Sequence, residues 1–390
     1  MSWNLTRLVA PTANQTFFDD YWEQKPLLVQ RERRDHFASL LTLEDIDRVI
    51  TTYGLFHPDI QIANKMREVR AEDYTYGTGL IDVARLYQQF ADGGTIILPQ
   101  LHGRLPALAA LCRSMEREMS IRFQTNIYFT PSNAQGFKAH YDNHDVFVLQ
   151  IHGSKRWALY DTPVQLPFRG QSFDPAVTKA GNVTMEFELR PGDMVYIPRG
   201  VMHDANTGDG ASLHITLGVL NTSWTDLLLE SLAMVGLRDA AFRHSLPVGY
   251  ANPDFDREKA RTTFKQLLTR VAELADFDSA LEHFADDLIS TRHGLLPGQL
   301  QQVQQLPSLT TDSRVGVRPS LLYKIDTRPD GISLRCYGSA FNFPAHIAGD
   351  IEFAVTHADF RVAELPGTLD DAGKLVLVRR LVREGVLQIL

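Results

Sequence analysis

Two short segments carry histidines and an aspartate in a pattern that suits a metal ion. The first is "AHYDNHDVF", in which one residue separates His140 from Asp142, and the second is "PGDMVYIPRGVMH", which ends at His203. Residues i and i+2 of a β-strand project from the same face, so we expect His140 and Asp142 to share one wall of a site. The glycine turns of the second segment let a neighbouring strand bring His203 beside them.

Two histidines and one carboxylate on one face of a metal leave three adjacent positions open. This arrangement is typical of non-haem Fe(II) sites that hold a chelating cosubstrate and O2 together. Zinc competes for the assignment, because it accepts the same ligand types in hydrolytic sites with one open position. An H-x-D pair alone is weak evidence, since a histidine bonded to an aspartate is common in ordinary cores. The downstream histidine in a β-rich segment makes a metal site the favoured interpretation.

Two further histidines lie close to the first pair in the sequence. His144 would share the strand face of His140 and Asp142 and is a candidate fourth ligand, although a substrate-facing or structural role is favoured. His152 stands beside Gly153 and is interpreted as a turn residue.

The composition indicates a soluble, mixed globular protein. The chain has 390 residues, of which 44% are hydrophobic and 22% charged, so we expect two or three domains with a substantial core. No amino-terminal signal and no apolar run of ~20 residues is present, and we expect a cytoplasmic protein without a membrane span. Cys112 and Cys336 have no metal-type partner nearby, so the ligands must be histidine and carboxylate.

The formal net charge of −8 argues against a general nucleic-acid binder, whose affinity rests largely on lysine and arginine. It would suit a basic partner. The plainer interpretation is that the charge keeps the protein soluble.

Changes of periodicity divide the chain. Residues 1 to about 125 mix short helices with loops, and Thr42 to Asp45 has the T-x-x-D pattern that begins a helix. From about 121 to 220, short β-type runs alternate with Gly, Pro and Asp turns, which predicts a small antiparallel sandwich or barrel.

From Ser223 the pattern becomes helical, and the apolar residues between Phe264 and Leu288 predict a pair of amphipathic helices. Their apolar face must be covered, either by the barrel or by a second copy of the chain. The stretch from about 310 combines helices and short strands of a size that resembles a winged helix. Because fold does not imply function and its basic residues are balanced by acids, an architectural or protein-contact role is favoured over DNA binding.

Five segments together resemble the cupin-fold, Jumonji-C-type 2-oxoglutarate oxygenases, specifically the ribosomal oxygenase branch. They are "FFDDYWEQKPLLV", "NIYFTP", "AHYDNHDVFVLQIHGSKRW", "PGDMVYIPRGVMH" and "HIT". The resemblance extends over nearly the whole chain and implies an α+β fold built on a double-stranded β-helix, the cupin or JmjC jelly roll. It implies a catalytic domain with an amino-terminal α/β extension over residues 1–222, a helical dimerisation domain over 223–305 and a winged-helix-like domain over 306–390.

The resemblance also implies roles for single residues. It assigns Fe(II) to His140, Asp142 and His203, with 2-oxoglutarate and O2 as cosubstrates. Lys155 falls on the position that holds the far carboxylate of 2-oxoglutarate. The other positions that resemble cosubstrate-binding residues are Asn126, Tyr128 and Thr216, with His214 as their neighbour; as bare sequence, each would be assigned to the polar face of a strand.

The implied function is an Fe(II)- and 2-oxoglutarate-dependent hydroxylase that acts, as a homodimer, on an arginine or histidine of a ribosomal protein or another basic peptide. The bacterial arginyl hydroxylases tend to have arginine where this chain has Lys155, whereas the lysine resembles the eukaryotic histidyl hydroxylases, so the target residue stays open. Two alternatives also stay open. One is a JmjC-type N-methyl-lysine demethylase, and the other is a non-catalytic metal-binding cupin that regulates a winged-helix DNA reader.

Overall fold

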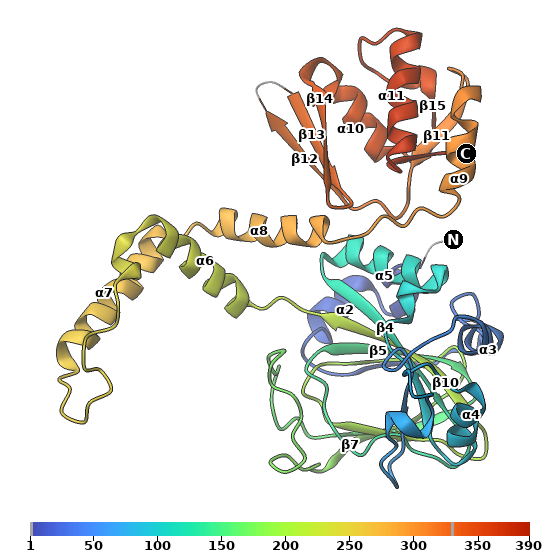
Figure 1. Ribbon diagram of the computed structural model, residues 1–390, viewed down its shortest axis with the longest axis vertical. Coiled ribbons are helices and arrows are strands. Elements are labelled where there is room, and N and C mark those ends of the chain that lie inside the picture. The colour runs from blue at the N-terminus through green and yellow to red at the C-terminus, as the bar shows by residue number, and fades with distance from the viewer. Residues whose placement is uncertain (1–2, 329–330) are drawn as a thin grey trace. The chain divides into compact units, whose positions relative to one another are not determined.

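The computed structural model describes residues 3–328 and 331–390, and the chain divides into two compact units (Figure 1). The first unit runs to Asn221 and includes Leu295–Gln299. The second unit takes Thr222–Gly294 and Leu300–Leu390. The expected division into three domains at 222 and 305 stays a prediction.

The first unit is built on two antiparallel sheets. The larger has seven strands, in the spatial order β1 (Leu27–Val29), β8 (Met194–Ile197), β5 (Asp145–His152), β10 (Ser212–Leu220), β4 (Arg122–Thr130), β3 (Thr95–Leu98) and β2 (Gln61–Ala63). The smaller has the order β7 (Val183–Leu189), β6 (Lys155–Tyr160) and β9 (His203–Asn206). This antiparallel β-structure agrees with the sandwich or barrel predicted for residues 121 to 220.

Strand β5 is apolar along most of its length because both of its faces are buried. Val146 and Val148 join the apolar layer between the two sheets, together with Leu159 of β6. Phe147 and Leu149, which alternate with them, belong to the larger core on the other face of the sheet. The run "VFVL" therefore fills two cores, as the alternation of side chains along a strand requires.

Helices from the amino-terminal part of the chain supply that larger core. They are α1 (Leu5–Val9), α2 (Asn14–Asp20), α3 (Leu43–Thr52), α4 (Val83–Ala91) and α5 (Pro106–Met119). The helix start predicted at Thr42 is confirmed, since the Thr42 hydroxyl accepts from the Asp45 N–H at 3.1 Å and the Asp45 carboxylate accepts from the Thr42 N–H at 3.0 Å.

The second unit begins with helices, followed by mixed helix and sheet. Its helices are α6 (Trp224–Arg238), α7 (Glu258–Leu274), α8 (Phe277–Ser290), α9 (Gln299–Gln305, whose first residue is assigned to the first unit), α10 (Ala348–Thr356) and α11 (Asp371–Arg383). Its strands form two antiparallel sheets, β15 (Phe360–Arg361), β11 (Arg314–Val317) and β16 (Leu387–Ile389), and β12 (Tyr323–Arg328), β13 (Gly331–Cys336) and β14 (Ser339–Pro344).

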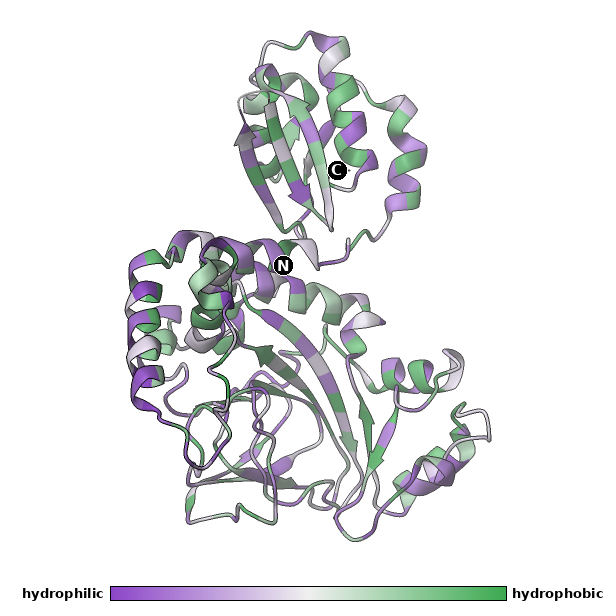
Figure 2. Cartoon of the chain, turned by 60° about the vertical axis from the view of Figure 1, so that its left-hand side comes forward, coloured by the Kyte–Doolittle hydropathy of each residue, from purple (hydrophilic) through white to green (hydrophobic). Residues whose placement is uncertain are grey.

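One apolar core connects residues from Leu306 to Leu387 of this unit. The helices of this second unit carry both hydrophobic and hydrophilic residues along their length (Figure 2). The likeness of this part to a winged helix stays a prediction. Within the described residues, no helix is long and apolar enough to cross a membrane.

Candidate metal centre and pocket

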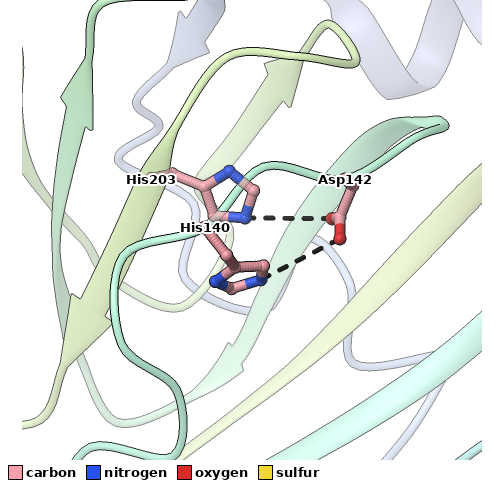
Figure 3. A group of neighbouring side chains, drawn as sticks. All are labelled: His140, Asp142 and His203. Atoms are coloured by element: carbon pink, nitrogen blue, oxygen red, sulfur yellow. Dashed lines mark ion pairs between the residues drawn. The ribbon is translucent and has the colours of Figure 1, made fainter. Parts of the chain in front are cut away.

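The structure brings His140, Asp142 and His203 together in the first unit (Figure 3). The ligand atoms of the three side chains lie within 4.8 Å of one another. The Asp142 carboxylate faces both rings, with 3.9 Å from Oδ1 to His140 Nε2 and 3.8 Å from Oδ2 to His203 Nε2. Two imidazoles and one carboxylate are thus close enough to hold one metal ion.

The local backbone that carries the first two ligands differs from the prediction. We expected His140 and Asp142 on a strand, but β5 begins only at Asp145. His140 instead forms an isolated bridge with His203, in which each N–H donates to the other's carbonyl at 3.1 and 2.8 Å. The Asp142 carbonyl accepts from the Gly200 N–H at 3.0 Å, so the chain is fixed to the turn before β9 rather than to a continuous ladder.

Hydrogen bonds to the backbone set the tautomer of both histidines. The Nδ1 atom of His140 lies 2.9 Å from the Lys138 carbonyl, and that of His203 lies 3.0 Å from the Val201 carbonyl. A carbonyl only accepts, so each Nδ1 carries the proton and each Nε2 keeps its lone pair toward Asp142. Burial lowers the pKa of His203, and the neighbouring His140 lowers it further, which favours the neutral form that binds metals.

The three candidate ligands line a pocket that also contains Lys155, the first residue of β6. Lys155 is buried, and its Nζ donates to the Thr130 hydroxyl at 3.0 Å. Within the described chain it has no acidic partner. Burial lowers the pKa of Lys155 to about 7. Since a buried cation without a counter-ion is costly, the pocket is suited to a ligand that brings a carboxylate.

Two further polar groups of the pocket have no hydrogen-bond partner among the described residues. The His214 ring stacks on Tyr128, with centroids 5.0 Å apart, and meets Trp157 edge-on at 5.7 Å. His214 Nδ1 and Trp157 Nε1 are both buried and, among the described residues, have no hydrogen-bond partner. Burial, and next the charge of Lys155, lower the pKa of His214 well below its usual value, so its ring is neutral. Unpaired buried polar atoms indicate the place of a polar ligand.

Of the other predicted cosubstrate residues, Tyr128, Thr216 and His214 line this pocket and Asn126 does not. Asn126 is paired with Thr216 in the register of β4 and β10, but its side-chain oxygen accepts from the backbone N–H of Gln100 at 3.1 Å. Its direct role in binding a cosubstrate therefore has no support from the geometry.

The two additional histidines lie outside the three-ligand group. The His144 ring packs on Gly218 of β10, where a Cβ would lie 2.8 Å from the ring, so its position depends on that glycine. Its Nε2 is buried and unpaired within the described part of the chain. His152 is exposed and is the last residue of β5, where it pairs with Leu213, so it lies in the strand directly before Gly153, which has a φ of 61°, and not in the turn itself.

Sequence reasoning missed two aromatic residues of the pocket, Phe137 and Trp157. The Phe137 ring lies 5.6 Å from that of His140, and the side chain is 44% exposed at the site. A signal for Trp157 was available, because it follows Lys155 by two residues and so shares its face of β6.

Comparisons with known proteins agree with this geometry. A family model described as "JmjC domain" matches residues 100–227, which include all three ligands and Lys155. This segment is a JmjC domain. Ribosomal oxygenase 2 of Rattus norvegicus is 33% identical over 255 residues, which cover 62% of this chain and 53% of the relative. The "bifunctional lysine-specific demethylase and histidyl-hydroxylase NO66" of Aedes aegypti is 28% identical over 315 residues, which cover 76% of this chain and 49% of that relative. The chain thus spans about half the length of these curated relatives.

Solved structures give the same answer for the fold. The X-ray structure of Escherichia coli YcfD has a TM-score of 0.58 at 15% identity and covers 97% of this chain and 99% of its own. A second structure, of the Escherichia coli ribosomal oxygenase YcfD in complex with cobalt and 2-oxoglutarate, has a TM-score of 0.55 at 15% identity and covers 97% of this chain and 98% of its own. The cupin or JmjC fold and the resemblance to the ribosomal oxygenase branch are confirmed.

Proposed function

We propose that this JmjC protein is an Fe(II)- and 2-oxoglutarate-dependent protein hydroxylase. The observation that carries the proposal is the group of His140, Asp142 and His203 beside a buried lysine that has no acidic partner among the described residues. These three residues would hold the metal, and Lys155 would bind the far carboxylate of the cosubstrate. When bound, the metal and its cosubstrates supply the oxidising power to convert a C–H group of the substrate into an alcohol.

The protein's own residues orient the metal-binding and cosubstrate-binding groups and form the wall of the pocket. The carbonyls of Lys138 and Val201 hold the two imidazole rings, and Thr130 holds the Lys155 ammonium. Burial, and next the charge of Asp142, raise the pKa of the Tyr128 phenol, so it remains a neutral hydrogen-bond donor at the wall. Val146, Val148 and Trp157 add apolar surface to the wall of the pocket.

The proposed substrate is an arginine or histidine side chain of a ribosomal protein, presented on a basic segment. The names of the relatives and the net charge of −8 support this class. We expect a ribosomal-protein peptide incubated with enzyme, Fe(II), 2-oxoglutarate and O2 to gain the mass of one oxygen atom, with fragmentation placing it on arginine or histidine. The His203→Ala protein is the matched control. A complete set of ribosomal-protein peptides without such a gain would overturn the substrate assignment. With this substrate, the proposed location is the cytoplasm.

A demethylase is the second candidate, because the name of the NO66 relative contains that activity beside histidyl hydroxylation. Hydroxylation of an N-methyl group would need the same ligands. A methyl-lysine peptide that loses its methyl group, while ribosomal-protein peptides stay unchanged, would favour the demethylase.

We also propose that the helices after the jelly roll form a homodimer contact. Trp224 and Leu228 of α6 and Phe264 of α7 are large apolar side chains that are more than half exposed. Apolar surface of this kind is stabilised by a partner, and a second copy of the chain is the proposed one.

Sedimentation of the wild-type protein should give twice the 43.9 kDa mass of one chain. Leu228→Glu should give the single-chain mass at the same micromolar concentration, since it places a charge in the contact. Leu300→Glu, the same change at an exposed leucine of α9, is the control and should remain dimeric. A monomeric wild-type protein would overturn the proposal.

A further inference from the structure

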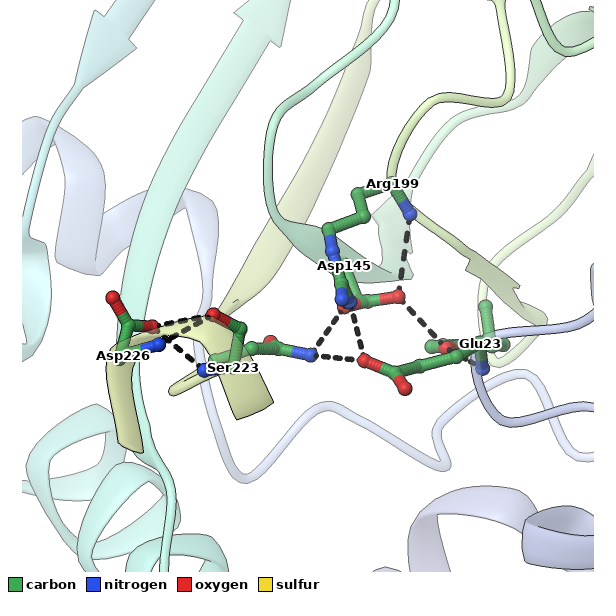
Figure 4. A network of polar contacts seen from close by, with 7 residues as sticks. Glu23, Asp145, Arg199, Ser223 and Asp226 are labelled. Atoms are coloured by element: carbon green, nitrogen blue, oxygen red, sulfur yellow. Dashed lines mark hydrogen bonds and ion pairs between the residues drawn. The ribbon is translucent and has the colours of Figure 1, made fainter. Parts of the chain in front are cut away.

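A buried carboxylate near the metal ligands has no role in the chemistry described above. Asp145, the first residue of β5, has no exposed surface and accepts four hydrogen bonds (Figure 4). Its Oδ1 accepts from the Tyr196 hydroxyl at 2.9 Å and from the Arg199 N–H at 3.2 Å. Its Oδ2 accepts from Arg199 Nη1 and from Asn221 Nδ2, both at 2.7 Å. Asp145 thus connects the start of β5 with two other segments, the one that carries Tyr196 and Arg199 and the one that carries Asn221.

Glu23, from the segment after α2, completes this cluster. Its Oε1 accepts from Arg199 Nη1 at 2.5 Å and from Asn221 Nδ2 at 3.0 Å, so two carboxylates share the same two donors. The Glu23 N–H donates to the Tyr196 hydroxyl at 2.9 Å. Glu23 has a φ of 57°, a left-handed conformation that a residue with a side chain adopts at a cost. The surrounding contacts hold it there.

The cluster fastens the two segments that carry the metal ligands. Asp145 follows Asp142 by three residues on one segment, and Arg199 precedes His203 by four residues on the other. Between them, the Gly200 N–H donates to the Asp142 carbonyl at 3.0 Å. Gly200 has a φ of 88°, and a Cβ there would lie 2.0 Å from the Val164 carbonyl oxygen, so the turn has little freedom to shift.

We propose that Asp145, Arg199 and Glu23 are positioning residues that set the separation of the two ligand-bearing segments and thereby the metal affinity of the site. The inference rests on the metal assignment of the proposed function. It assigns a task to the amino-terminal segment as well, because Glu23 belongs to that segment. A cluster that only stabilises the fold is the competing explanation, and metal affinity distinguishes the two.

The test uses the full chain, freed of metal and titrated with Co(II), whose visible absorption reports its coordination. Asp145→Asn keeps the size of the side chain but removes the charge that holds Arg199. We expect it to lower Co(II) affinity about 10- to 100-fold and to change the Co(II) spectrum, as removal of an orienting partner does at other metal sites. Glu23→Gln is a milder change at a partly exposed position, and it provides the test if Asp145→Asn does not fold. We expect it to cause a smaller fall in Co(II) affinity and the same change of the Co(II) spectrum.

The matched control is Glu116→Gln, which removes the charge of another buried ion pair, Arg113 with Glu116 in α5. It should keep the wild-type affinity and spectrum even where it lowers the unfolding temperature. Wild-type affinity and spectrum in both Asp145→Asn and Glu23→Gln would overturn the inference, and so would an equal loss in Glu116→Gln. A wild-type protein that binds no Co(II) would instead overturn the metal assignment itself.

Discussion

The His203→Ala protein is expected to fold and to lose its metal, and with it all turnover of 2-oxoglutarate. His203 supplies one of three ligand atoms that lie within 4.8 Å of one another, and an alanine leaves only His140 and Asp142. The same result is expected for alanine at either of those positions. The measurement is an anaerobic titration with Fe(II) and 2-oxoglutarate, in which the chelated pair gives a visible metal-to-ligand charge-transfer band.

The fold should survive this change. The lost hydrogen bond from His203 Nδ1 to the Val201 carbonyl contributes about 1 kcal/mol, which is small against the roughly 5–15 kcal/mol that keeps a typical domain folded. Circular dichroism and a cooperative thermal transition would check it. Removing a buried ring also leaves a space, so a modest fall in the unfolding temperature is expected.

The control is His152→Ala, because His152 is an exposed histidine at the end of β5 that lies outside the ligand group. It should keep the band and the turnover of the wild type. A band of full intensity in His203→Ala would contradict the ligand assignment. Tight zinc binding without a band in the wild-type protein would instead favour the hydrolytic zinc site.

The grouping of His140, Asp142 and His203 was predictable from the sequence because each residue is marked by its local pattern. His140 and Asp142 precede an apolar run, and His203 follows a turn with Pro198 and Gly200. The start of α3 was equally local, since Thr42 and Asp45 are three residues apart and bond to each other. Short-range patterns of this kind depend on a few neighbouring residues and not on how the rest of the chain folds.

Features that depend on distant contacts could not be predicted in the same way. The cluster around Asp145 joins Glu23 to Arg199, which are 176 residues apart. The late start of β5 follows from the contact of Gly200 with Asp142, and the loss of Asn126 from the pocket follows from its bond to Gln100. In each example a polar group of the side chain or the backbone finds its partner in a distant segment, and the sequence around that group carries no mark of it.

Lys155→Met should raise the stability of the metal-free protein and remove its affinity for 2-oxoglutarate. The lysine is buried without an acidic partner in the described chain, and its folded-state pKa of about 7 lies below its usual 10.5. The unfolded chain therefore holds one more proton than the folded one between these two values, and stability rises with pH across that window. Methionine has a similar length and no charge. The rise of stability with pH that Lys155 causes should therefore be absent from the variant when thermal unfolding is measured from about pH 6 to about pH 9.

The same pKa predicts how cosubstrate binding depends on pH. Only the protonated Lys155 attracts a carboxylate, so the affinity of the Fe(II)-loaded wild type for 2-oxoglutarate should fall as pH rises above about 7. Lys155→Arg keeps its charge throughout this range, and any affinity that it retains should be independent of pH. The adjacent His214 is neutral over the whole range because its pKa lies well below its usual value, so it adds no step of its own. A wild-type affinity that stays constant between about pH 6 and about pH 9 would show that a group other than Lys155 holds the carboxylate.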